Sequence, residues 1–131
     1  MPQISGLREL HQFLSLRAVE VVRLAARSDD GLAALVAPSA SFSLGAGDVG
    51  RPLGTGINGA RALSRTMKAD TYRFLGWDYM DTPADPCSKR TVEVEFIDSQ
   101  DKNVSRVEFT FEAGRVVSVD GWERSFETGR L

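Results

Sequence analysis

The chain has 131 residues, 42% of them hydrophobic and 26% charged, which is the size and composition of one globular domain, here expected to span residues 1–131. Sixteen basic and eighteen acidic residues leave a net charge of −2, and no basic tract stands out, which argues against nucleic acid as a partner. No apolar run approaches the roughly 20 residues of a membrane helix, and Met1–Gly6 does not resemble a signal peptide. With Cys87 as its one cysteine, the protein is expected to be cytoplasmic and to lack an internal disulfide.

Three helices are expected. Residues 7–27 carry apolar side chains at helical spacing over most of the circumference, which predicts a helix covered on more than one side. A short second helix is predicted over 31–37, ended by Pro38, and a third over 59–69.

Strands are expected from residue 39 onward. Residues 45–56 hold five glycines and Pro52 and are predicted to be a loop. Two polar turns, at residues 99–103 and at Ala113–Gly114, separate the last three strands. The predicted strands are 39–44, 71–80, 90–98, 104–112 and 115–122.

The last three strands alternate between apolar and polar residues, which indicates an antiparallel meander with one buried face. We expect Val107, Phe109 and Phe111 to point inward while Glu108 and Thr110 point outward. Pairing then places a second inward set on the last strand: Val117, Val119, Gly121 and Glu123.

The order is therefore helix, helix, strand, helix, then four strands. Helices followed by a run of strands are typical of an α+β domain in which the helices pack on one face of an antiparallel sheet.

This order resembles the nuclear transport factor 2-like superfamily, which includes ketosteroid isomerase and the SnoaL-like polyketide cyclases. Three stretches carry the resemblance: Ser28-Asp29-Asp30-Gly31-Leu32 with Ala34-Leu35 and Ala40-Ser41-Phe42, then Gly56–Leu63, and the hairpin Phe109–Val117. The resemblance implies a cone-shaped, curved sheet that encloses a pocket open at one end. It also implies reactions without a cofactor and a homodimer formed through the sheet.

The same resemblance places three catalytic roles of ketosteroid isomerase at Glu20, Leu44 and Val107, where that enzyme has a tyrosine and two aspartates. Leucine accepts no proton and valine donates no hydrogen bond, so isomerase chemistry by that route is not expected.

Other residues remain as candidates for a site. Glu20 and Glu123 are candidate catalytic acids, since apolar surroundings raise the pKa of a carboxyl group; the alternative is that both are solvated charges. Tyr72 and Tyr79 are further candidates to line a pocket for a flat apolar ligand, and packing in the sheet is the alternative. The predicted ligand-binding residues are Phe42, Leu44, Val107, Phe109, Val119 and Trp77.

Metal and nucleotide sites are not expected. One histidine, His11, and one cysteine are too few ligands for zinc, and His11 is expected on the surface or rim. Gly54–Gly59 spells the dinucleotide-binding pattern, but the stretch before it is a poor strand, so we expect no nucleotide there.

The leading functional hypothesis is a pocket for a small apolar or aromatic molecule, with cofactor-free proton transfer, hydration or cyclisation if the protein is an enzyme. The sequence does not decide that last question. The alternative is a non-catalytic module that forms a homodimer through the outer sheet face, and an interior filled by core side chains would favour it. The expected outer-face residues include Glu93, Glu108, Asp120 and Arg106, with Ile97, Val116 and Trp122 as its main apolar members.

Overall fold

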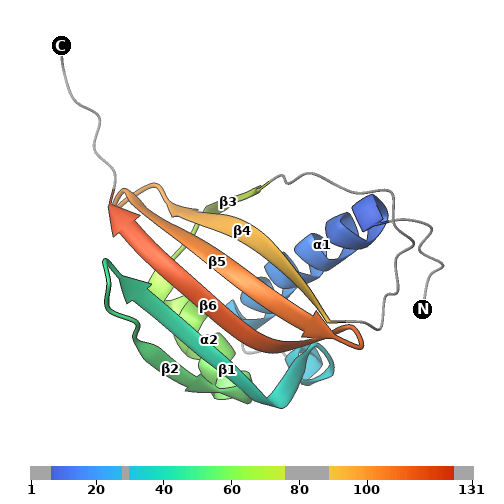
Figure 1. Cartoon of the computed structure of the whole chain (residues 1–131). Coiled ribbons are helices and arrows are strands. Elements are labelled where there is room, and N and C mark those ends of the chain that lie inside the picture. Colours follow the sequence, from blue (N-terminus) through green and yellow to red (C-terminus); the bar gives the residue numbers. More distant parts are fainter. Residues whose placement is uncertain (1–6, 28–29, 76–88, 126–131) are drawn as a thin grey trace.

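The computed structural model describes residues 7–27, 30–75 and 89–125 (Figure 1). They form two α-helices, one short 3₁₀ helix and six strands. In chain order these are α1 (Leu7–Ala26), η1 (Asp30–Ala34), β1 (Val36–Ala46), β2 (Pro52–Thr55), α2 (Gly56–Met67), β3 (Thr71–Phe74), β4 (Arg90–Asp98), β5 (Asn103–Glu112) and β6 (Arg115–Ser125).

The six strands form one curved, unclosed sheet in the order β2-β1-β6-β5-β4-β3, with β2 and β3 at its edges. Neighbouring strands are antiparallel except β1 and β6, which are parallel. The expected α+β class is confirmed, and the expectation of a wholly antiparallel sheet is wrong at this one pair. After the meander β4–β5–β6, the last strand runs in the same direction as β1 and lies beside it.

Both helices lie on one face of the sheet (Figure 1). That face is apolar because the strands alternate, and α1 places its own apolar stripe against it. The core between them includes Leu10, Leu14, Phe42, Leu44, Val107 and Phe109, none more than 2% exposed.

The meander has the predicted register. Val92 pairs with Phe109 and Val94 with Val107 across β4 and β5, and all four are buried. Glu108 is exposed, which confirms the predicted facing of β5. The turn at Ala113–Gly114 has φ angles of 53° and 81°, the double positive φ of a tight two-residue hairpin.

A bulge changes the facing of β6. Thr110 pairs with Ser118 but Phe111 pairs with Val116, so Val117 is an extra residue in β6. Val116 and Val119 are both buried, at 0% and 1% exposed. The expectation that Val116 faces outward and Val117 inward is therefore wrong, because simple alternation does not anticipate an inserted residue.

The segment before the sheet also differs from the prediction. The expected helix over 31–37 is the 3₁₀ helix η1, and β1 begins at Val36. Pro38 lies within the strand, where the β1–β6 register shifts between Val36 and Ser41. Proline lacks an N–H donor and is tolerated at such an irregularity, so it does not end the element.

The expected loop over 45–56 contains an edge strand. β2 pairs with β1, with Ser41 opposite Thr55 and Phe42 opposite Gly54. Helix α2 then begins at Gly56, three residues earlier than predicted, and Lys68 caps it in the left-handed conformation with φ of 50°. The expected strand over 71–80 is observed as β3 from Thr71 to Phe74; Leu75 lies beyond its end, and residues 76–80 lie outside the described residues.

Candidate functional site

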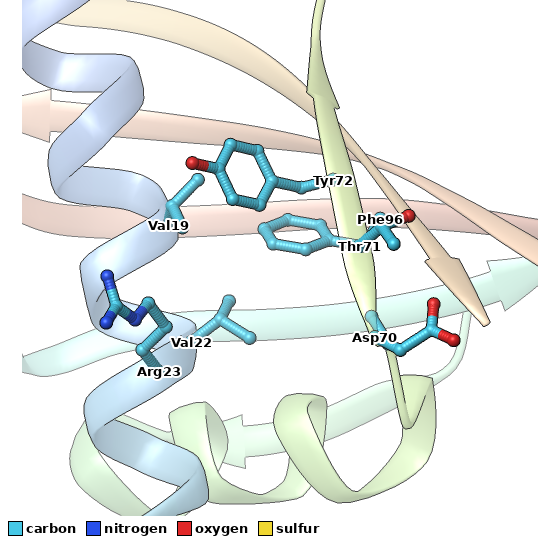
Figure 2. A pocket seen from close by; sticks show the side chains of 8 residues that line it. Val19, Val22, Arg23, Asp70, Thr71, Tyr72 and Phe96 are labelled. Carbon is cyan, nitrogen blue, oxygen red and sulfur yellow. The ribbon is translucent and has the colours of Figure 1, made fainter. Parts of the chain in front are cut away.

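A groove lies between α1 and the β3 edge of the sheet, with a volume of about 240 Å³ (Figure 2). It opens beside the last turns of α1 and the short connection from α2 to β3. Its lining residues are Val19, Val22 and Arg23 of α1, Ala69 and Asp70 of the connection, Thr71 and Tyr72 of β3, and Phe96 of β4.

The walls of the groove are apolar and aromatic. Val19 and Phe96 are 4% and 3% exposed, whereas the Tyr72 ring is 47% exposed. Tyr72 lies opposite Phe96 in the β3–β4 register, so the two rings are on the same face of the sheet. In Figure 2 both rings point from the sheet toward Val19 and Val22. The groove therefore offers a surface for a flat apolar group.

Two charged residues belong to the lining. The Asp70 carboxylate accepts hydrogen bonds from Ser99, at 3.1 Å from Oγ and 3.4 Å from the backbone N–H. In Figure 2 it points away from Val19 and Val22. The Arg23 guanidinium is on the α1 side, 3.6 Å from the Glu20 carboxylate. Within the described lining, Arg23 is thus the residue that gives the α1 wall its positive charge.

The predicted ligand-binding residues lie elsewhere. Phe42, Leu44, Val107, Phe109 and Val119 are each at most 1% exposed and belong to one apolar core. The structure places all five away from the lining of the groove. Their role in ligand binding stays a prediction, and Trp77 and Tyr79 lie outside the described residues.

The structure does not bring the two candidate catalytic acids together. The Glu20 side chain is 44% exposed on α1 and pairs with Arg23, which lines the groove although Glu20 does not. Glu123 faces the same side of β6 as Val119, as alternation predicts, and pairs with Ser105 of β5. It lines a separate, shallow cleft with Asn103, Ser125 and others.

His11 is buried, at 5% exposed, so the expectation of a surface or rim histidine is wrong. The buried arc of α1 is wide enough to include both His11 and Ser15, one helical turn apart. Burial lowers the pKa of the His11 imidazole below its usual value.

A metal-binding cluster and a membrane-spanning helix are both absent from the part of the chain that the structure describes. Among residues 7–27, 30–75 and 89–125, no group of three or more histidine, cysteine or acidic side chains is arranged to hold a metal ion. Within the same residues, neither helix combines the length and the apolar character needed to cross a membrane.

The glycine pattern at Gly54–Gly59 is explained by packing. A dinucleotide site needs two parallel strands joined through the helix, whereas β2 and β3 lie at opposite edges and each is antiparallel to its neighbour. A Cβ atom at Gly59 would lie 2.5 Å from the Phe42 ring, and one at Gly56 would lie 2.8 Å from the Pro38 carbonyl oxygen. Both glycines let α2 approach β1 closely.

The other face of the sheet carries charged side chains in cross-strand rows. Glu93, Glu108 and Asp120 are opposite one another on β4, β5 and β6. Arg106 donates to Glu93 at 2.6 and 2.9 Å. Partial burial, the hydrogen bond to Glu93 and the negative charges of Glu93 and Asp120 together raise the pKa of Glu108.

Among the described residues, Trp122 is the large exposed apolar side chain of this face, at 46% exposed. It lies beside Gly45 of β1, where a Cβ atom would be 2.8 Å from its ring. This outer face is the surface predicted to form a homodimer.

Sequence reasoning missed most of the groove. Val19, Val22 and Arg23 recur at the i, i+3 and i+4 spacing of one helix face, which was a usable signal. Nothing local in the sequence shows which strand this face of α1 packs against. The groove forms there because β3 is an edge strand, and the strand order is not a local property of the sequence. Of the described lining residues, Tyr72 is the one that the sequence offers as a candidate for a pocket.

No protein-family model matches the chain, and no curated protein matches it in sequence. Among solved structures it is similar to a cystatin-like fold protein from Burkholderia xenovorans LB400, with 12% identity and a TM-score of 0.49 over 96% of this chain and 100% of that chain. It is also similar to a proposed isomerase from Rhodopseudomonas palustris, with 11% identity and a TM-score of 0.46 over 84% of this chain and 88% of that chain.

A third similar structure comes from de novo design of proteins with diverse pocket structures, with 18% identity and a TM-score of 0.44 over 86% of this chain and 99% of that chain. All three TM-scores are below 0.5, so these are distant likenesses.

Proposed function

We propose that this protein is a member of the nuclear transport factor 2-like superfamily and binds a small apolar or aromatic molecule in the groove between α1 and β3. The order of elements and the three stretches that resemble the family support the first part. One observation carries the second: the half-exposed Tyr72 ring and the buried Phe96 ring form one wall, and Val19 and Val22 of α1 form the other.

The size of the groove limits the ligand. Its volume of about 240 Å³ is below the roughly 300–1,000 Å³ of typical small-molecule sites. A single ring with a short substituent suits this space better than a fused polycyclic ligand such as a steroid. Rings stack or pack edge to face, so the aromatic wall favours a planar ligand.

Binding is the activity proposed here. Cofactor-free proton transfer, hydration or cyclisation needs an acid or base that touches the ligand. Among the described lining residues the one carboxylate is Asp70, which accepts hydrogen bonds from Ser99. The groove therefore supports recognition of a ligand more directly than chemistry on it.

A thermal-shift screen with single-ring aromatic compounds tests this proposal. At tenfold excess over its Kd a ligand should raise Tm by about 4 °C, because binding only the folded state stabilises it. Tyr72→Ala should abolish the shift. Phe74→Ala is the matched control, since Phe74 is 39% exposed on the same face of β3 but does not line the groove. No shift with any compound, or equal loss in both variants, would contradict the proposal.

The second candidate function is a non-catalytic module that forms a homodimer. It is favoured because Val107, Phe109 and Val119 fill the core where a cone-shaped pocket was expected. Trp122 also favours it, because this exposed ring pairs with Arg106 on the sheet face opposite the buried Val107. The two functions use opposite faces of the sheet and are compatible with one another.

A further inference from the structure

We infer that the preferred ligand of the groove carries a carboxylate group beside its ring, and that Arg23 binds this carboxylate. The inference rests on the proposed function, because it names the class of ligand for the same groove. Four observations lead to it.

The first observation is the position of Arg23. It follows Val22 directly and lies one turn after Val19 on α1, so its side chain belongs to the same wall as the two valines. Figure 2 shows Val19 and Val22 facing the Tyr72 and Phe96 rings, with Arg23 beside Val22 and its guanidinium turned toward the outer side of α1. The Arg23 side chain is 58% exposed, so a change of rotamer can bring its guanidinium to a carboxylate substituent on a ring packed between these walls.

The second observation is that the Arg23 guanidinium has more N–H donors than its ion pair with Glu20 uses. A guanidinium presents five N–H donors in a planar fork, and a carboxylate accepts two of them side by side. The one ion pair found for Arg23 in the described part of the chain is with Glu20, through a single Nη1 to Oε2 distance of 3.6 Å. Both side chains are exposed, at 58% and 44%, and exposed pairs of this kind contribute little.

The third observation is that Asp70, the negatively charged residue of the described lining, already has hydrogen-bond partners. Asp70 accepts two hydrogen bonds from Ser99, and Figure 2 shows its carboxylate directed away from the α1 wall. It is therefore poorly placed to bind a cationic ligand or to repel an anionic one at Arg23. In the described part of the chain, Glu20 is the acidic residue paired with Arg23, and it is expected to compete with a ligand carboxylate.

The fourth observation is the contrast between the apolar and the charged residues of the lining. The Tyr72 and Phe96 rings and Val19 offer apolar contacts, whereas Arg23 supplies the positive charge of the described lining. A ligand with an apolar ring and one anionic group matches both parts. A neutral ring would satisfy the first part and leave Arg23 without a new partner.

A pair of probes with the same shape tests this inference: phenylacetate and its neutral amide, phenylacetamide. We expect the wild-type protein to bind phenylacetate about five- to tenfold more tightly in isothermal titration calorimetry at low salt. Arg23→Gln should remove this preference by weakening phenylacetate binding alone. Arg8→Gln removes the same charge from an exposed position on α1 outside the groove and should leave the preference intact.

A gain-of-affinity variant makes the test independent of folding defects. Glu20→Gln removes the competing carboxylate, so it should tighten phenylacetate binding about two- to threefold and leave phenylacetamide unchanged. Weaker binding of phenylacetate by this variant would contradict the inference.

The outcomes separate this inference from the proposed function. Equal affinity of the wild type for both probes, or equal effects of Arg23→Gln and Arg8→Gln, would overturn the role of Arg23 and leave the groove as a site for aromatic rings. Failure of both probes to bind at millimolar concentration would overturn both proposals.

Discussion

Tyr72 and Phe96 lie directly opposite each other on β3 and β4, yet Tyr72 is 47% exposed and Phe96 only 3%. Opposite residues in neighbouring strands share one face of the sheet, so both rings are on the helix side. Phe96 is buried in the core, whereas Tyr72 on the edge strand is left half uncovered. This difference produces the groove, because the apolar face of the sheet continues beyond the core.

Phe109→Ala should cost about 3–5 kcal/mol of unfolding free energy, because it removes a fully buried ring from the core. Denaturant unfolding measures this loss. Phe74→Ala is the matched control and should cost less than about 1 kcal/mol, since the ring of Phe74 is 39% exposed. Similar losses in the two variants would show that Phe109 is not part of a packed core.

Glu108→Gln should raise Tm at pH 7 and leave it nearly unchanged at pH 4. The pKa of Glu108 in the folded protein is raised above its ordinary value of 4.5, first by burial and then by its neighbours Glu93 and Asp120. Below pH 4.5 the carboxyl group is protonated in both folded and unfolded states and costs nothing. As pH rises through the folded pKa, its ionisation lowers stability, and glutamine avoids that cost.

Glu112→Gln serves as the control for this pH series, because Glu112 is exposed at the end of the same strand. Thermal unfolding of the wild type and both variants between pH 4 and 8 gives the comparison. A stabilisation by Glu108→Gln that is as large at pH 4 as at pH 7 would rule out the titration of this carboxyl group as its cause.

Trp122→Ala should shift the protein from dimer toward monomer without changing its circular dichroism. The half-exposed indole is the main apolar side chain of the sheet face opposite the helices, and tryptophan is enriched among residues that dominate interfaces. Its neighbours on this face include Arg106, opposite it on β5, and Asp120, two residues earlier on β6, so the interface is expected to be polar and sensitive to salt.

Sedimentation velocity at micromolar concentration decides this prediction. Tyr72→Ala, which removes an exposed aromatic ring from the helix side of the sheet, should remain a dimer. A monomeric wild type, or a Trp122→Ala dimer as tight as the wild type, would contradict the predicted interface.

The last three strands could be predicted from the sequence because alternation and tight turns are local signals. The positive φ angles at Ala113 and Gly114 agree with the predicted turn, and Phe109 faces inward as predicted. The bulge at Val117 could not be predicted, because it depends on how β5 and β6 pair rather than on either strand alone. The start of β1 could not be predicted for the same reason. Pro38 is tolerated within this strand because the pairing of β1 with β6 is irregular there.

The groove could be predicted only in part. The face of α1 with Val19 and Val22 could be identified from helical spacing, but its distance from β3 depends on the strand order of the whole sheet. The resemblance to a cone-shaped family directed attention to Phe42, Leu44 and Val119, which the structure places in the packed core. The expected cytoplasmic location and the single domain remain predictions.

Chemical-shift mapping with a bound single-ring aromatic acid tests the central claim most directly. In ¹⁵N- and methyl-labelled protein, titration with phenylacetate should perturb Val19, Val22 and Tyr72 and leave the core residues Leu44 and Val119 unchanged. That pattern would place the ligand in the groove between α1 and β3. Perturbations centred on Leu44, Val107 and Val119, with Tyr72 unaffected, would instead place the ligand inside the core and contradict the account.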